Sequence, residues 1–213
     1  MTAGELRALL AASLPPAAVS WLEESRTQIK SRPAAIRELF PAAGRRCGRG
    51  PLAIVDDGFR GWTVDDAVRC LLLGALPYPG TQLLATMGEL YANGAAAERR
   101  GVLRALTLLR HCPDVGDAAV PIVTDALRTN DPRLISAALG EYAATHLGAA
   151  EYRQAVLKCV FCGIPLADVA GLPARADAEL TRALMDYVRE REAAGRAVPA
   201  DVGPLVESTR GRR

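Results

Sequence analysis

Apolar residues recur at helical spacing along nearly the whole chain, with polar residues on the opposite faces. Residues 15–30 form an amphipathic pattern that opens on proline, which suits the first helical turn. In WTVDDAVRCLLL, Thr63 and Asp66 fit a capping box, and three consecutive leucines predict a largely buried helix. The periodicity predicts further helices over residues 33–40, 79–92, 95–112, 117–129, 132–146, 149–162 and 177–194, with a weak one near 200–208.

Two segments mark where this helical pattern stops. Residues 44–62 are rich in Gly, Arg and Asp without a sustained period, so we expect the longest loop there, including the strand-like run PLAIVDD. At NDPRL, Asp131 can cap a helix and Pro132 suits its first position. The sequence therefore predicts an all-α fold. It would be an array of antiparallel helix hairpins, arranged as a HEAT-like stack or an orthogonal helical bundle.

The chain length favours one globular unit, which we divide into three segments. Residues 1–61 contain the N-terminal helices and the Gly/Arg-rich loop, residues 62–198 the helical core, and residues 199–213 a short helix and a basic tail. Half of the 213 residues are hydrophobic, which is enough for a sizeable core.

Charge and cysteine content narrow the classes of function. A net charge of +2 is too mild for a typical nucleic-acid binder. The apolar run LLLGAL is far shorter than the roughly 20 residues of a transmembrane helix, and the N-terminus lacks a signal-peptide pattern. Five cysteines do not make a disulfide framework. We therefore expect a cytoplasmic protein with no transmembrane segment and no nucleic-acid partner.

Lys158 lies in the apolar run QAVLKCVFCGIPL, although the chain has only one other lysine. At 100° per residue it shares a helical stripe with Glu151, Gln154 and Cys162. The stripe is either an ordinary solvated face or the wall of a cleft whose cation holds an anionic ligand.

If Lys158 has a structural role, its side chain should make two specific contacts. Its stem should pack against the helix of residues 177–194. Its amine should meet a carboxylate, because an unpaired lysine in an apolar wall loses its proton or costs several kcal/mol. Asp186 and Glu190 are the first choices, and Glu151 is the local alternative.

A second polar stripe lies on the 95–112 helix, where Arg100, Arg104, Thr107 and His111 share one face. We interpret this stripe as a solvated face, and an anion-binding groove is the alternative.

Four other candidates have local explanations. Arg69 follows Asp65 by four residues, a good spacing for a helical ion pair, and Arg128 suits the negative end of its helix dipole. Cys159 and Cys162 have metal-pair spacing, but there is no second CxxC and the chain has only two histidines. We interpret both cysteines as small core residues and expect no metal site.

Familiar catalytic signatures are missing from the sequence. There is no GxGxxG, P-loop, GxSxG or HExxH motif. The acidic pairs Asp56–Asp57 and Asp65–Asp66 lack the third acid of the magnesium-binding motif for prenyl diphosphates. The balance is against an enzyme, and we expect no cofactor.

The chain contains four spaced stretches that are similar to those of a known family: GWTVDDAVRCLLL, ALRTN, RQAVLKCVFCGIPLADVAGL and LMDYVREREAAGR. They resemble the EboA-domain family, small helical proteins encoded in bacterial and algal metabolite gene clusters. The resemblance runs from about Trp62 to Arg196. The polar positions that match the family are Arg69, Arg128, Asn130, Gln154, Lys158, Asp186, Glu190 and Arg191.

The resemblance implies an accessory protein encoded beside pathway enzymes such as a UbiA-like prenyltransferase. We expect a non-catalytic scaffold of a metabolite biosynthesis or export pathway, which binds a pathway enzyme or a hydrophobic intermediate. The competing interpretation is an enzyme acting on an anionic, prenyl- or sugar-phosphate-like molecule, with Lys158, Arg128 and Arg104 as phosphate partners. Convergence of these cations in a deep pocket would favour the enzyme, and a flat apolar groove the scaffold.

Overall fold

The computed structural model describes residues 3–52 and 59–205, and the part it describes is helical almost throughout. The only β pairing in that part is an isolated antiparallel bridge between Pro51 and Thr63. The all-α prediction is therefore confirmed. In chain order the elements are α1 (Ala3–Ser13), α2 (Pro16–Ser31), η1 (Pro33–Ala35), α3 (Ile36–Cys47), α4 (Val64–Leu73), α5 (Gly80–Asn93), α6 (Ala96–Ala105), η3 (Leu106–Leu109), η4 (Gly116–Ala119), α7 (Val120–Arg128), α8 (Pro132–Ala138), α9 (Glu141–His146), α10 (Ala149–Cys162), η5 (Leu166–Asp168), α11 (Leu172–Arg175) and α12 (Ala178–Ala193), where η marks a short 3-10 helix.

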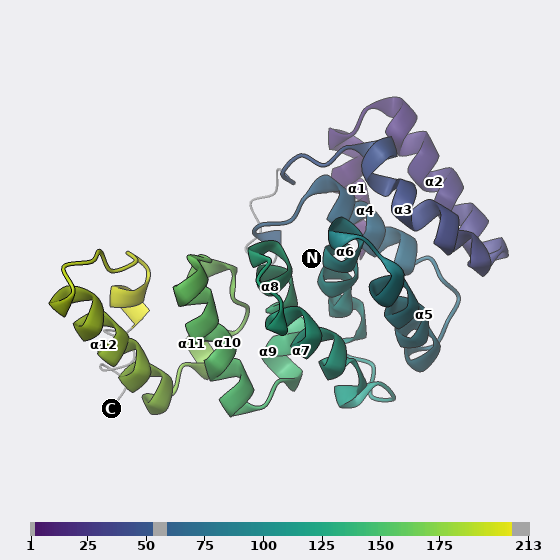
Figure 1. The fold of residues 1–213 in the computed structure, drawn as a ribbon. Helices are drawn as coiled ribbons and strands as arrows, with labels where there is room; N and C mark the ends of the chain where they lie inside the picture. Colours follow the sequence, from purple (N-terminus) through teal and green to yellow (C-terminus); the bar gives the residue numbers. More distant parts are fainter. Residues whose placement is uncertain (1–2, 53–58, 206–213) are drawn as a thin grey trace.

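The helices form an open row rather than a closed bundle. Helix α4 packs on α6, α6 on α8, α8 on α10, and α10 on α12, while α2 and α3 pack on α4. Figure 1 shows this row running from α12 at one end to α2 and α3 at the other. Helices α5 and α7 lie beside it, against α6 and α8. Helix α6 is therefore covered from several sides.

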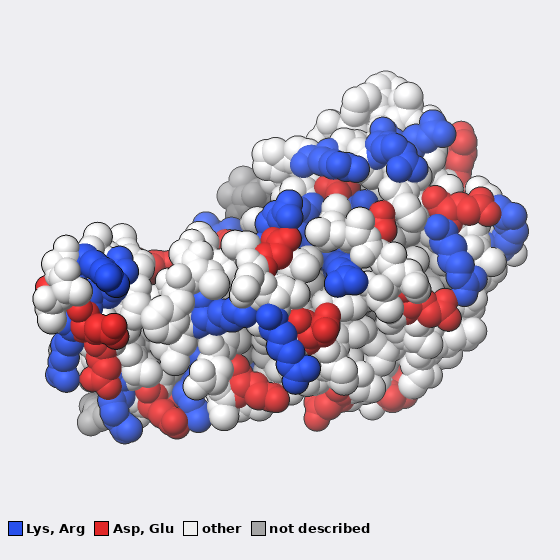
Figure 2. Space-filling model, in the orientation of Figure 1, with Lys and Arg blue, Asp and Glu red and all other residues white. Residues whose placement is uncertain are grey.

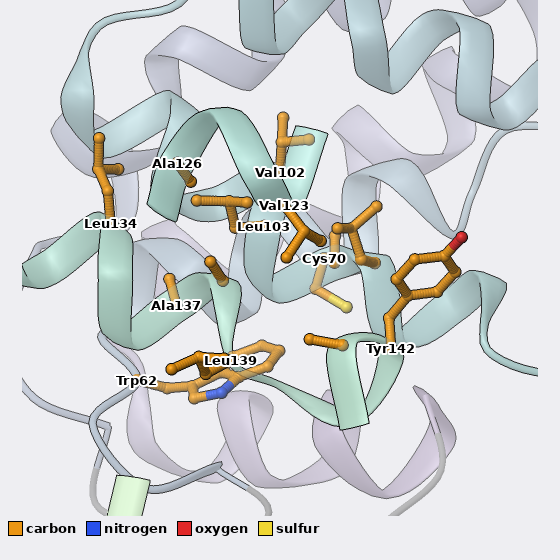
Figure 3. Packing of buried hydrophobic residues seen from close by; sticks show 14 of the residues in the cluster. Trp62, Cys70, Val102, Leu103, Val123, Ala126, Leu134, Ala137, Leu139 and Tyr142 are labelled. Carbon is orange, nitrogen blue, oxygen red and sulfur yellow. The ribbon is translucent and has the colours of Figure 1, made fainter. Parts of the chain in front are cut away.

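A single cluster of buried apolar side chains connects the row from end to end. It extends from Leu6 in α1 to Val202 beyond α12. Figure 3 shows its centre, where Val102 of α6, Val123 of α7 and Leu134 of α8 are drawn among the packed residues. Most members are aliphatic, as the low aromatic content of the sequence predicts.

Local sequence signals start two of the helices where they were expected. The backbone N–H of Thr63 donates to the Asp66 carboxylate at 3.1 Å, as in a capping box. The Asp131 carboxylate accepts from the backbone N–H of Arg133 at 2.9 Å, with Pro132 in the first turn. Both predicted caps are confirmed.

Three predicted helix boundaries are wrong. Helix α3 continues to Cys47, so the expected loop of residues 44–62 begins later; Ala43 and Cys47 extend the buried stripe of Phe40. The 95–112 helix becomes 3-10 after Ala105, and the 132–146 helix is interrupted before Glu141. Burial against other helices determined these helix boundaries more than local helix propensity did. Most of PLAIVDD lies outside the described residues.

Two buried carboxylates at the start of α4 join α4 to α6. The side chains of Asp65 and Asp66 are both 0% exposed. Arg69, one turn further along α4, pairs with Asp65 as predicted. Arg100 of α6 donates its Nε to Asp66 at 2.9 Å and its Nη2 to Thr63 Oγ1 at 2.7 Å. Arg100 also lies 3.4 Å from Asp65, so it bridges the two buried carboxylates, while Arg69 pairs with Asp65 alone.

The same network depends on a close approach between the two helices. The Nε of Arg69 donates to the backbone carbonyl of Phe40 at 3.2 Å, which adds α3 to the network. A Cβ at Gly101 of α6 would lie only 2.5 Å from Arg69 Cδ. Only glycine leaves room for the arginine there, so α6 can lie directly over it.

We predict that Arg69→Met destabilises the protein by about 3–5 kcal/mol, because it removes the close ion pair of the buried Asp65 carboxylate. The carboxylate keeps the Thr63 hydroxyl and a contact with Arg100 at 3.4 Å, which is too long to replace that pair. The measurement is urea unfolding at neutral pH. The matched control is Arg37→Met, which breaks the exposed Arg37–Glu89 ion pair on the surface and should cost at most about 1 kcal/mol. Equal losses in the two variants would contradict a structural role for the buried pair.

Candidate functional site

The two arginines of the predicted solvated stripe are largely covered in α6, whereas Thr107 is half-buried and His111 is exposed beyond the helix. Arg104 is only 7% exposed, and the Arg100 side chain is 14% exposed. The interpretation as a solvated face is therefore wrong for Arg100 and Arg104 and holds for His111. The reason is that α6 lies between α4 and α8, so its polar face is covered as well as its apolar face.

A cavity of about 460 Å³ lies beside Arg104. The segment before α4 supplies its aromatic wall, α6 and the following turns supply cations, and α9 and η5 supply acids. Its aromatic and charged lining residues are Phe59, Arg60, Trp62, Arg104, Arg110, Glu141 and Asp168. The volume falls within the range of small-molecule sites.

The Arg104 guanidinium is only partly satisfied by the protein. Its Nη2 donates to the Gly61 carbonyl and to Ser136 Oγ, each at the long distance of 3.3 Å. The guanidinium lies 5.8 Å from the centre of the Trp62 ring. Its Nε is buried and has no hydrogen-bond partner. Burial lowers the pKa of Arg104, although the nearby Asp66 and Asp168 carboxylates oppose this shift.

Arg104 also borders a second, smaller hollow. This hollow has a volume of about 260 Å³ and shares Arg104 and Asp168 with the larger cavity, while Gly61 lines the smaller hollow alone. Gly61 has a φ of +71°, and a Cβ there would lie 3.3 Å from Arg104 Nη2. A side chain at this position would be both strained and crowded. The glycine thus lets the backbone approach the guanidinium beside the smaller hollow.

A third hollow, the α7–α10 groove, has a volume of about 730 Å³. Three predicted site residues, Arg128, Gln154 and Lys158, line this groove together with several apolar side chains. The structure therefore brings these three candidates together, apart from Arg104.

The predicted carboxylate partner of Lys158 is wrong. Its Nζ donates to the backbone carbonyls of Leu127 at 2.6 Å and Thr129 at 2.7 Å. These carbonyls belong to the C-terminal end of α7, where helical acceptors have no helical donor and the dipole is negative. Asp186 instead lies 3.5 Å from Arg189 on α12, and Glu190 and Glu151 are exposed.

The α7–α10 groove also contains an exposed aromatic side chain. Phe161 is 69% exposed, and its ring packs edge-on against Tyr187 of α12 at 5.2 Å. Cys162 beside it is exposed, which corrects the prediction that both cysteines are core residues. Cys159 is buried as predicted, and burial raises the pKa of its thiol to about 12.

The remaining predicted site residues lie elsewhere. Arg69 is inside the buried ion-pair network, Asn130 is exposed at the α7–α8 junction, and Asp186 and Glu190 are exposed on α12. Sequence reasoning missed Trp62, Arg110, Glu141 and Asp168 as cavity residues. No periodic signal links them, because they come from different elements.

Two further properties concern the described part of the chain as a whole. Within residues 3–52 and 59–205, no helix combines the length and apolar character needed to cross a bilayer. The described residues also contain no cluster of three or more His, Cys, Asp or Glu side chains arranged for a metal ion. On the face drawn in Figure 2, basic and acidic side chains are interspersed.

The fold and these hollows define an all-helical protein with a small-molecule-sized cavity around a buried arginine. The family model described as "Metabolite traffic protein EboA" matches residues 2–207. The chain belongs to this EboA family, and the match extends beyond the Trp62–Arg196 stretch of the sequence resemblance. Membership indicates a role in a metabolite pathway. No curated protein and no solved structure matches the chain.

We predict that Lys158→Met, which keeps the stem and removes the amine, destabilises the protein by about 1–3 kcal/mol. Hydrogen exchange should accelerate most at the α7–α8 junction, where the Leu127 and Thr129 carbonyls lose their donor. Gln154→Met on the same stripe is the control, with a change within about 0.5 kcal/mol. An unchanged exchange pattern in Lys158→Met would show that the amine does not hold this junction.

Proposed function

We propose that this protein is a non-catalytic accessory protein of a metabolite pathway, which binds a small intermediate in the Arg104 cavity. The observation that carries the proposal is the incompletely paired guanidinium of Arg104, buried beside a cavity of about 460 Å³. Buried polar groups are normally satisfied, and exceptions call for an explanation. A ligand anion supplies that explanation.

The composition of the cavity wall supports a ligand with both charged and apolar parts. Arginine presents a planar fork of donors that suits oxyanions. Trp62 and Phe59 add aromatic surface, with ring centres 4.6 Å apart. Ligand pockets typically combine such apolar surface with a few placed polar groups.

An enzyme acting on an anionic small molecule is the alternative. It has some support, because Asp168 and Glu141 border the same cavity as Arg104 and carboxylates can act in acid–base catalysis. The cations proposed to converge do not, however, share one cavity: Arg104 lines the charged one, while Lys158 and Arg128 line the α7–α10 groove. A binding role accounts for this separation more directly.

We predict that Arg104→Met abolishes metabolite binding and leaves the free energy of unfolding within about 1 kcal/mol of the wild type, or raises it. Replacing an incompletely paired buried charge with an apolar side chain is often neutral or stabilising. The measurement is mass spectrometry of small molecules released from protein purified from its native host, with urea unfolding in parallel.

Arg128→Met, in the α7–α10 groove, is the matched control for Arg104→Met and should retain the metabolite. If both variants retain it, or the wild type releases none, the cavity is not the binding site. Conversion of the released compound on incubation with fresh protein would replace the accessory role with the enzyme alternative.

We also propose that the protein contacts a pathway enzyme, such as a UbiA-like prenyltransferase, through the α7–α10 groove. The support is the exposure of Phe161 beside Leu157 in an open and mainly apolar hollow. Exposed apolar surfaces of this kind often mark contact sites. An aromatic side chain at the centre of a contact typically contributes more than 1 kcal/mol.

We predict that Phe161→Ser lowers recovery of a UbiA-like prenyltransferase of the host at least about tenfold, when the full chain is purified from host membranes in detergent. Phe161→Tyr keeps the ring and should retain the enzyme. If the wild type, Phe161→Ser and Phe161→Tyr recover equal amounts of the prenyltransferase, the α7–α10 groove is not the contact site.

A further inference from the structure

We infer that the Arg104 cavity selects an aromatic monocarboxylate rather than a phosphate ester. This inference rests on the proposed function and specifies the class of ligand. It follows from the charges around the cavity, the weak hydrogen bonds of the Arg104 guanidinium and the position of the aromatic rings.

The charges that line the cavity favour an anion with a single negative charge. Arg110 and Glu141 lie 3.8 Å apart and offset each other. Arg104 remains as the buried cation of the lining, with the Asp168 carboxylate near it. A phosphate monoester would bring a second negative charge close to two carboxylates, at an electrostatic cost.

The guanidinium of Arg104 can take a carboxylate without losing strong bonds. Its Nε is covered by protein, so a bidentate contact through Nε requires the guanidinium to turn. The two bonds that this turn would weaken are both 3.3 Å long. A charge-assisted bidentate pair is shorter and stronger than either of them. Arg100, by contrast, is held by Asp66 and Thr63 at 2.7–2.9 Å and stays in place.

The aromatic wall indicates which group should be attached to the carboxylate of the ligand. Trp62 lies under the Arg104 guanidinium at 5.8 Å, and the Phe59 ring meets Trp62 at an interplanar angle of 60°. A carboxylate on Arg104 would therefore have two ring faces or edges next to it. Planar apolar groups pack well in offset or edge-on contact with such rings. An aromatic body attached to the acid satisfies both parts of the site.

The test uses three probes with the same ring system: 1-naphthoate, 1-naphthyl phosphate and 1-naphthamide. Binding to the full chain is measured by titration calorimetry at pH 8, where the ester is dianionic. We expect 1-naphthoate to bind at least about tenfold more tightly than the other two probes. Arg104→Met should reduce its affinity to that of the amide, and Arg128→Met should leave it unchanged.

Two results overturn the inference while leaving the proposed function intact. One is equal or tighter binding of 1-naphthyl phosphate that depends on Arg104. The other is failure of all three probes while a host metabolite still copurifies with the wild type and not with Arg104→Met. If neither probes nor metabolite bind, the inference and the proposed function fall together. Equal binding of naphthoate and naphthamide also overturns the inference, because the charge would then be irrelevant.

Discussion

Two completely buried carboxylates set the register of α4 against α6, and the rest of the structure is built around that contact. Asp65 and Asp66 cannot stay charged at such depth without partners, so Arg69 and Arg100 are committed to them from the two helices. The absence of a side chain at Gly101 lets the helices meet over Arg69. With α6 held there, the next turn places Arg104 at the junction with α8.

Arg100 and Arg104 lie one turn apart on α6, yet their hydrogen bonding differs sharply. Arg100 has close acceptors, whereas Arg104 has two long contacts and an unpartnered Nε. A fold selected for stability alone has no reason to keep such a group. Sites that break a local rule in this way are where binding or catalysis is expected. This is why the proposed ligand is placed in the charged cavity beside Arg104.

The α7–α10 groove has a different character, although it contains a lysine and an arginine. The amine of Lys158 is occupied by the C-terminal carbonyls of α7, so it supports the junction between two helices. What the groove offers to another molecule is mainly apolar surface around Phe161. The charged cavity and the open apolar groove lie in different parts of the row, which is consistent with the two separate contacts that we propose.

The sequence by itself determined what depends on residues within one helical turn. The helical periodicity, the caps at Thr63 and Asp131, and the Asp65–Arg69 pair are interactions over four residues or fewer, so spacing alone predicted them. Tertiary structure decided everything that depends on which helix covers which face. Periodicity separates polar from apolar faces, but it does not show that α8 covers the polar face of α6, and so it predicted a solvated Arg104. Nor does it bring Trp62 and Asp168 together, or supply Lys158 with carbonyls instead of a carboxylate, because these contacts join residues that only the packing of the helix row makes neighbours.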